Sequence, residues 1–156
     1  MIEIERKFLV KGDFYPYAIK KSRIIQGYLC ISGGITVRVR LKDESAFITI
    51  KGPSGRTGFS RAEFEYPIPY TDAVELMNLC QSIIEKDRYY VLEGKRTFEV
   101  DVFHGVHEGL VIAELELSSE NETFNRPDWL GKEVTGDARY YNSYLSTHHF
   151  IGLNHA

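Results

Sequence analysis

The stretch Thr36-Val37-Arg38-Val39-Arg40-Leu41-Lys42 alternates, from Val37 onward, between apolar and cationic side chains. Successive side chains of a β-strand point to opposite faces of its sheet. The stretch therefore predicts a strand with Val and Leu on one face and Arg and Lys on the other. Three cations side by side on one face repel each other. This face therefore needs a neighbour that neutralises it.

The same alternation extends to both sides of this stretch. Runs of alternating residues that end at Gly, Pro, Asp or Ser predict eight strands. Their bounds, to within about 2–4 residues, are 2–9, 23–31, 35–43, 46–52, 60–66, 86–93, 96–103 and 110–118. Short connections such as Gly33-Gly34 and Glu93-Gly94-Lys95 favour antiparallel hairpins.

The charges on one face of these strands are sorted by sign. The third, fourth and sixth strands carry only cations there, the seventh and eighth carry only acids, and the first carries two acids and then a lysine. The fifth strand mixes Arg61 with Glu63 and Glu65. A face that only meets water would mix signs on every strand. The other members of the set are Glu3, Glu5, Lys7, Arg38, Arg40, Lys42, Lys51, Lys86, Arg88, Glu99, Asp101, Glu114 and Glu116.

Two architectures accommodate this pattern. An open antiparallel sheet would expose its charged face to water and form cross-strand ion pairs. A closed barrel would turn the charged face inward and remove the unpaired edges. The apolar face continues over all eight strands, which is more than two helices obviously cover, and the cationic strands hold little Ser or Thr. We therefore predict a mainly β (α+β) fold, an eight-stranded antiparallel β-barrel tunnel with a few flanking helices, as a single domain over residues 1–156.

Helices are expected at three places. Asp72 with Glu75 fits a capping box, and the apolar residues from Val74 to Ile84 then form one wide face. A last helix is expected over residues 137–150, and a short one near residues 14–19. These few helices would lie around the barrel.

A bore lined in this way has a definite chemistry. Arg binds phosphate through paired hydrogen bonds, and carboxylates bind hard cations such as Mg²⁺ and Mn²⁺. Both walls in one cavity predict a metal–polyphosphate site. The net charge of −3 argues against a nucleic-acid partner. The sequence has no apolar run of the roughly 20 residues that span a bilayer, no signal peptide and two unrelated cysteines. We expect a cytoplasmic protein without a membrane partner.

The segment Glu3-Ile4-Glu5-Arg6-Lys7 resembles the E-x-E-x-K signature that opens the CYTH, or triphosphate tunnel metalloenzyme, family. The resemblance covers essentially the whole chain, and the C-terminal part of the sequence is similar to that of the short bacterial members. It implies an eight-stranded tunnel. The further matching segments, in order, are Thr36-Val37-Arg38-Val39-Arg40, Thr49-Ile50-Lys51-Gly52, Arg61-Ala62-Glu63-Phe64-Glu65, Lys86-Asp87-Arg88-Tyr89, Glu99-Val100-Asp101-Val102-Phe103, Ala113-Glu114-Leu115-Glu116-Leu117 and Val134-Thr135-Gly136-Asp137-Ala138-Arg139-Tyr140.

The resemblance implies roles for individual residues. Lys7 is a catalytic candidate that helps to activate the attacking water, and Tyr28 either assists it or is an ordinary barrel aromatic. Glu63 and Glu65 bind metal or, as we favour, hold neighbouring cations in place. The expected phosphate-binding residues are Lys7, Arg38, Arg40, Lys51, Arg61, Lys86 and Arg88. The expected ligands of Mg²⁺ or Mn²⁺ are Glu3, Glu5, Asp101, Glu114 and Glu116.

Three functions follow from this reading. The first is metal-dependent hydrolysis of inorganic triphosphate to phosphate and pyrophosphate. The second is adenylate cyclase or thiamine triphosphatase activity on an organic triphosphate, for which Trp129 would be the one obvious extra aromatic. The third is a polyphosphate-binding module without catalysis.

Several residues outside the charged face also carry expectations. Trp129 is predicted to be a packing anchor, Arg139 a surface residue or a cap on the tunnel, and His104 and His107 solvent-facing residues of a turn. The apolar outer faces of the strands need cover, so a homodimer is plausible.

Overall fold

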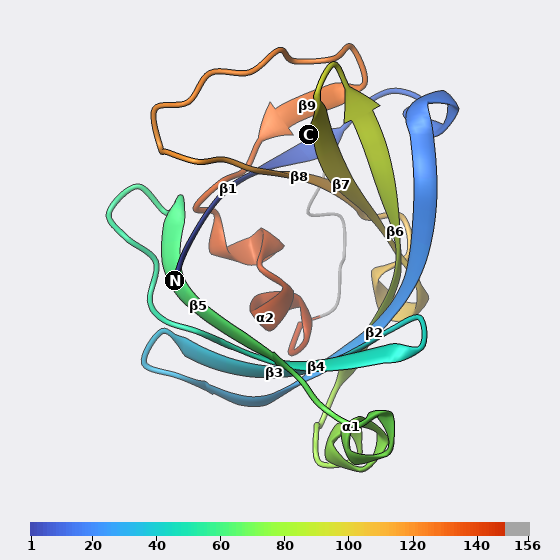
Figure 1. Cartoon of the computed structure of the whole chain (residues 1–156), viewed down its shortest axis with the longest axis vertical. Coiled ribbons are helices and arrows are strands. Elements are labelled where there is room, and N and C mark those ends of the chain that lie inside the picture. Colours follow the sequence, from blue (N-terminus) through green and yellow to red (C-terminus); the bar gives the residue numbers. More distant parts are fainter. Residues whose placement is uncertain (149–156) are drawn as a thin grey trace.

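The computed structural model describes residues 1–148 and confirms the predicted barrel (Figure 1). The strands are β1 (Ile2–Val10), β2 (Ala18–Ser32), β3 (Ile35–Lys42), β4 (Ser45–Lys51), β5 (Ser60–Pro67), β6 (Ile83–Glu93), β7 (Arg96–Phe103), β8 (Val111–Glu116) and β9 (Leu130–Glu133). The α-helices are α1 (Tyr70–Met77) and α2 (Asn142–Leu145), and 3₁₀ turns lie at Tyr15–Tyr17, Gly105–His107 and Ala138–Tyr140.

Eight antiparallel strands form the ring. Their order is β5-β4-β3-β2-β6-β7-β8-β1, and β1 pairs back to β5 through Ile2–Ala62, Glu3–Arg61 and Ile4–Ser60. Further along β1, the side that faced β5 pairs instead with β9, at Phe8–Glu133 and Val10–Leu130. The C-terminal part of the chain therefore completes the barrel wall where β5 no longer reaches β1.

The first helix is shorter than the sequence predicts. It ends at Met77, and Ile83 and Ile84 belong to β6. A short apolar run fits a buried strand as well as a helix. Here it forms a strand, because this places Ile84 fully buried inside the barrel. The expected capping box is also wrong, because Pro69 is the N-cap and no side chain caps this end.

The expected C-terminal helix is divided into two short pieces. A 3₁₀ turn over Ala138–Tyr140 is followed by α2, because Tyr141 between them is extended (φ −74°, ψ 138°). Residues 149 and 150 of that expectation lie outside the described residues. The expected helix near residues 14–19 is a single 3₁₀ turn, since Ala18 already begins β2.

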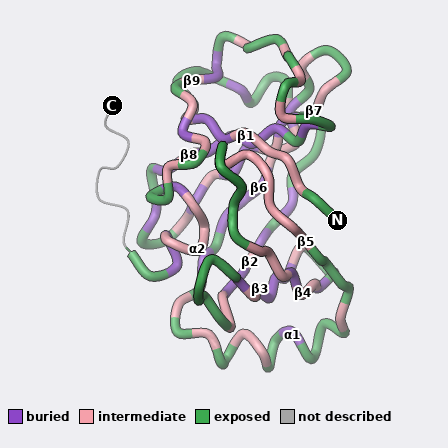
Figure 2. Tube along the Cα trace, turned by 90° about the vertical axis from the view of Figure 1, so that its left-hand side faces the viewer, coloured by how far each residue is buried: buried purple, intermediate pink, exposed green. Residues whose placement is uncertain are grey.

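Two apolar clusters cover the outside of the barrel. In the first, Trp129 packs edge-on against Phe98, with a ring-centroid distance of 5.2 Å, and lies among Phe8, Phe14 and Val100. Trp129 is therefore the packing anchor that the sequence predicts. In the second, Ala73 of α1 covers the outer faces of β3 and β4, while the far side of the helix stays exposed (Figure 2).

A third apolar cluster lies inside one end of the barrel. The inward-facing residues Leu9, Ile84, Phe103 and Ile112 pack against residues that follow β9. The C-terminal members of this cluster are Val134, Tyr140 and Leu145, and Figure 1 shows α2 within the ring of strands. These apolar side chains form a plug that fills one end of the bore, and the charged side chains line the part of the bore beside the plug.

In the described part of the chain, no helix is long and apolar enough to cross a membrane.

Candidate active site

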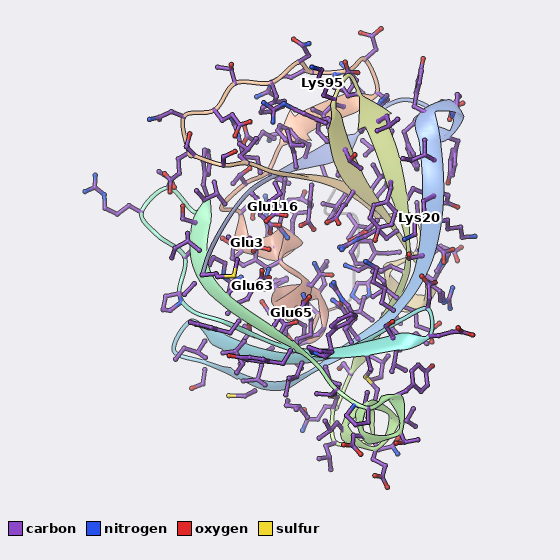
Figure 3. All side chains as sticks on the ribbon, viewed as in Figure 1. Glu3, Lys20, Glu63, Glu65, Lys95 and Glu116 are labelled. Carbon is purple, nitrogen blue, oxygen red and sulfur yellow. The ribbon has the colours of Figure 1, made fainter. Side chains whose placement is uncertain are left out.

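A charged cavity occupies the bore beside the apolar plug. All eight strands of the ring supply lining residues, and the C-terminal segment adds Thr135, Gly136, Tyr141, Asn142 and Ser143. Figure 3 shows four carboxylates, those of Glu3, Glu63, Glu65 and Glu116, within the ring. The charged lining residues are Glu3, Glu5, Lys7, Arg38, Arg40, Lys42, Lys51, Arg61, Glu63, Glu65, Arg88, Glu99, Glu114 and Glu116. The sorted charges of the sequence thus face one enclosed space.

The acidic wall lies on β1 and β8, which place their carboxylates in register. Glu5 lies opposite Glu116, and Lys7 lies opposite Glu114. Glu99 of β7 lies opposite Glu114 on its other side. The strand pairing therefore brings acids from three neighbouring strands into one patch.

Burial and the neighbouring charges shift the pKa values of the carboxylates in this wall. Burial, followed by the negative charge of Glu114, raises the pKa of Glu5 well above its usual value. Burial also acts to raise the pKa of Glu114, but the charge of Lys7 and a hydrogen bond from Glu5 hold it well below its usual value. Burial and the charge of Glu3 raise the pKa of Glu116. The acidic wall is short of positive charge.

The basic wall lies opposite, on β3 and β6, and is short of negative charge around Arg40. Arg38, Arg40 and Arg88 are each less than a tenth exposed. Burial, and then the charges of Arg38 and Arg88, lowers the pKa of Arg40 to about 9. Among residues 1–148, the Nε atom of Arg38 is one of the few buried side-chain polar atoms without a hydrogen-bond partner. A buried donor of this kind, beside two further guanidinium groups, suits an anionic ligand.

Carboxylates of β5 hold two of the cations. Glu63 lies 3.6 Å from the Nζ atom of Lys51, and Glu65 lies 3.7 Å from Arg38. The Lys51 ammonium also donates to Glu3 at 2.7 Å. These contacts agree with the holding role that we favour for Glu63 and Glu65. Arg61 lines the cavity and donates to the backbone oxygen of Gly52 at 3.0 Å.

Lys7 lies between the acidic wall and the C-terminal segment. Its Nζ atom is 3.7 Å from Glu114 and 5.6 Å from the centre of the Tyr141 ring. Burial acts to lower its pKa, but the charges of Glu114 and Glu5 outweigh burial and raise it. Lys7 is therefore an ammonium group. Tyr28 also lines the cavity, opposite Arg38 in the β2–β3 pairing.

Lys86 and Asp101 lie deeper than the sequence suggests. Neither lines the cavity, and Asp101 is 1% exposed. Its oxygens accept from Arg88 at 2.8 and 2.9 Å and contact Lys86 at 2.7 Å. Burial acts to raise the pKa of Asp101, but these two cations lower it to about 2. Asp101 thus holds the cations of the wall from behind.

Three further expectations are settled by position. Arg139 is exposed and pairs with Asp137 at 2.6 Å, as a surface residue does. The solvent-facing position expected for His107 is wrong, because its ring is buried and contacts the backbone oxygen of His148 at 2.9 Å. His104 is partly exposed and contacts Asp87 at 2.8 Å.

The sequence did not single out the lining residues of the C-terminal segment. Thr135, Tyr141 and Asn142 lie far along the chain from the strands that they face, so no strand periodicity marks them. The family-like segment Val134-Thr135-Gly136-Asp137-Ala138-Arg139-Tyr140 was the one sequence feature that pointed to this region.

The oxygen-rich acidic wall fits a hard divalent cation, but as a partial set of ligands. Within residues 1–148, no three Asp, Glu, His or Cys side chains lie close enough to hold a metal by themselves. Mg²⁺ commonly takes one or two carboxylates, together with water and substrate phosphate oxygens. The wall therefore suits a metal ion whose coordination is completed by a phosphate ligand.

Comparisons with known proteins agree with this geometry. Residues 1–142 match the family model of the CYTH domain. The chain is 50% identical to the inorganic triphosphatase of Acetivibrio thermocellus over 92% of both chains. It is 37% identical to that of Nitrosomonas europaea, over 94% of this chain and 97% of the relative. The crystal structure of the inorganic triphosphatase NE1496 matches with a TM-score of 0.68 at 33% identity, over 93% of this chain and 97% of that one. The chain belongs to the CYTH domain family.

Proposed function

We propose that this protein hydrolyses inorganic triphosphate to phosphate and pyrophosphate inside the barrel, with a divalent metal ion. The observation that carries the proposal is the pair of facing walls, one short of negative charge and the other short of positive charge. A metal–triphosphate complex supplies both missing charges at once. Two relatives that match nearly the whole chain are inorganic triphosphatases.

The basic wall is the proposed phosphate site. Arg38, Arg40 and Arg88 present buried guanidinium groups, which match phosphate oxygens in pairs. Lys7, Lys51 and Arg61 line the same cavity and extend the site. Lys86 supports it from beneath, since its ammonium group is fully buried against Asp101.

The acidic wall is the proposed metal site, with Mg²⁺ or Mn²⁺ as the ion. Glu3, Glu5, Glu114 and Glu116 all line the cavity and would hold the metal. The bound ion supplies the charge that neutralises phosphate oxygens during transfer. Asp101 was also expected among the ligands, but its contacts with Arg88 and Lys86 favour a supporting role instead.

The proposed reaction is an attack of water on a terminal phosphorus. The water oxygen forms the new P–O bond, the bridging oxygen leaves with its electron pair as part of pyrophosphate, and the proton of water ends on a product phosphate. Lys7 is protonated, so it orients the water and stabilises negative charge rather than accepting a proton. Tyr28 is placed to assist from the same cavity.

An organic triphosphate is the second candidate substrate. Trp129 lies in the outer core and does not stack in the bore, but Tyr28, Phe47, Phe59 and Tyr141 line the cavity. A ring of a nucleotide or of thiamine can stack on such side chains. Binding without catalysis is the third candidate, and its cationic wall would be the same.

A phosphate-release panel distinguishes these functions. We expect Mg²⁺- or Mn²⁺-dependent release from tripolyphosphate, with slower release from ATP and thiamine triphosphate and none after chelation by EDTA. Faster turnover of ATP or thiamine triphosphate would favour the organic substrate. Tight tripolyphosphate binding with no release in either metal would favour the binding module.

Glu114→Gln and Glu116→Gln test the acidic wall. Each change removes a charge that neutralises the metal, so we expect phosphate release from tripolyphosphate to fall by about 100-fold or more. Circular dichroism should show an intact barrel. Glu108→Gln changes an exposed acid outside the cavity and serves as the control. A double variant with wild-type activity would contradict the site.

Arg38→Lys tests the basic wall. Lysine keeps the charge but loses the paired geometry, so we expect tripolyphosphate to bind about 10-fold more weakly, measured by calorimetry without metal. Arg139→Lys is the matched control, because Arg139 is exposed and pairs with Asp137. Equal affinities for wild type and Arg38→Lys would argue that the anion lies elsewhere.

We further propose a cytoplasmic homodimer without a nucleic-acid or membrane partner, whose barrel forms one domain over residues 1–156. The outer side chains of Ile2, Phe64 and Tyr66 are about half or more exposed and lie on adjacent strands. An uncharged apolar face can pair with its own copy.

The cysteines are free, as in a reducing compartment, which supports the cytoplasmic location. Sedimentation velocity should give a dimer that Phe64→Glu dissociates; a monomeric wild type would contradict it.

A further inference from the structure

Asn142 connects the C-terminal segment to side chains that lie behind the arginines of the basic wall. It is the first residue of α2 and lines the cavity. Its Oδ1 atom accepts two hydrogen bonds, from the Lys86 ammonium at 2.9 Å and from the Gln26 amide at 3.1 Å. One neutral oxygen thus joins side chains of β6 and β2.

Each of these two donors continues to an arginine of the cavity. Gln26 accepts from the Nε atom of Arg40 at 2.8 Å. Lys86 contacts Asp101 at 2.7 Å, and Asp101 accepts both hydrogen bonds from Arg88. Asn142 therefore joins two branches of a polar chain, one of which ends at Arg40 and the other at Arg88.

The position of Asn142 is itself fixed by the packing inside the barrel. Leu145, one turn later in α2, is 1% exposed among the inward residues of β6, β7 and β8. On the N-terminal side, the backbone N–H of Val134 donates to the backbone oxygen of Lys7 at 2.8 Å, and the backbone N–H of Lys7 donates to the Thr135 hydroxyl at 2.9 Å. The segment that carries Asn142 is thus attached to the wall on both sides.

We propose that Asn142 is a positioning residue that holds Arg40 and Arg88 at the spacing that receives adjacent phosphate oxygens. This inference rests on the proposed function, because it assigns the spacing to a triphosphate. Cations packed this closely repel and need fixed partners. Because Asn142 is a neutral acceptor, it fixes Lys86 and Gln26 without cancelling the positive charge that attracts the substrate. A carboxylate at this point would cancel part of that charge.

Asn142→Ala is the direct test, with Thr147→Ala as the control on an exposed residue of the same segment. Calorimetry with tripolyphosphate in the absence of metal should show about 10-fold weaker binding for Asn142→Ala. Phosphate release with Mg²⁺ should show a KM raised by a similar factor and kcat within about threefold of wild type, because ground state and transition state lose the same contacts.

Gln26→Met provides a second variant and a double-mutant cycle. If the two residues act through one chain, the double variant should bind about 10-fold more weakly than wild type and not about 100-fold. Thermal unfolding by circular dichroism identifies a variant that fails to fold. If Asn142→Ala does so, Asn142→Leu, which keeps the side-chain volume but has no acceptor, replaces it with the same change in affinity expected.

Several outcomes would overturn the inference. Wild-type affinity in a folded Asn142→Ala, additive effects in the cycle, or a fall in kcat at unchanged KM would each exclude positioning of the phosphate-binding arginines. A wild type that binds tripolyphosphate without hydrolysing it would end the proposed function, while the affinities would still decide the role of Asn142. A wild type that does not bind tripolyphosphate would end both.

Discussion

Repulsion among buried charges is the constraint on which the rest of this barrel depends. Three guanidinium groups, those of Arg38, Arg40 and Arg88, lie less than a tenth exposed on one side of the bore. Charges in such a place are tolerated only with fixed partners, and removing one partner of a buried pair costs about 3–5 kcal/mol. Asp101, behind Arg88, is the clearest of these partners, since both of its oxygens are engaged. Asp101 thus stabilises Arg88 from behind, while the buried Nε atom of Arg38 has no partner in the described part of the chain.

The two walls solve the same problem in different ways. The basic wall holds its cations with carboxylate partners. In the acidic wall, burial and the charge of Glu114 raise the pKa of Glu5, while Lys7 and a hydrogen bond from Glu5 lower that of Glu114 against the effect of its burial. The first arrangement suits an anion, and the second suits a cation that neutralises the clustered carboxylates. Seven acidic and seven basic side chains line the cavity, so the strongly charged bore adds nothing to the net charge of −3.

The C-terminal segment supplies what the eight strands lack. β1 pairs with β5 over three residues only, and β9 then takes over that side of β1. The residues after β9 turn into the bore, where Val134, Tyr140 and Leu145 cover apolar side chains that would otherwise face the cavity. The same segment brings Tyr141 near Lys7 and Asn142 to Lys86. Core packing and site geometry are therefore joined in this part of the molecule.

The sequence by itself determined the eight strands of the ring, apart from some of their ends, together with the inward face and the sign of each wall, but not β9. A period of two residues is a local property, so the alternation in Thr36-Val37-Arg38-Val39-Arg40 and in Glu3-Ile4-Glu5-Arg6-Lys7 is readable without contacts. For the same reason, the cavity-lining places of Arg38, Arg40, Glu114 and Glu116 follow from the pattern.

Only the tertiary structure decided depth and partners. Lys86 and Arg88 share one face of β6, yet Arg88 lines the cavity and Lys86 lies beneath it, because the plug reaches one end of the strand and not the other. The sequence pattern predicted that the apolar run ending in Ile84 is helical. In the structure, Ile84 belongs to a strand, because the barrel buries it there. Asn142 lies 56 residues from Lys86 in the chain, and such a contact depends on where the last segment packs, which no local period encodes.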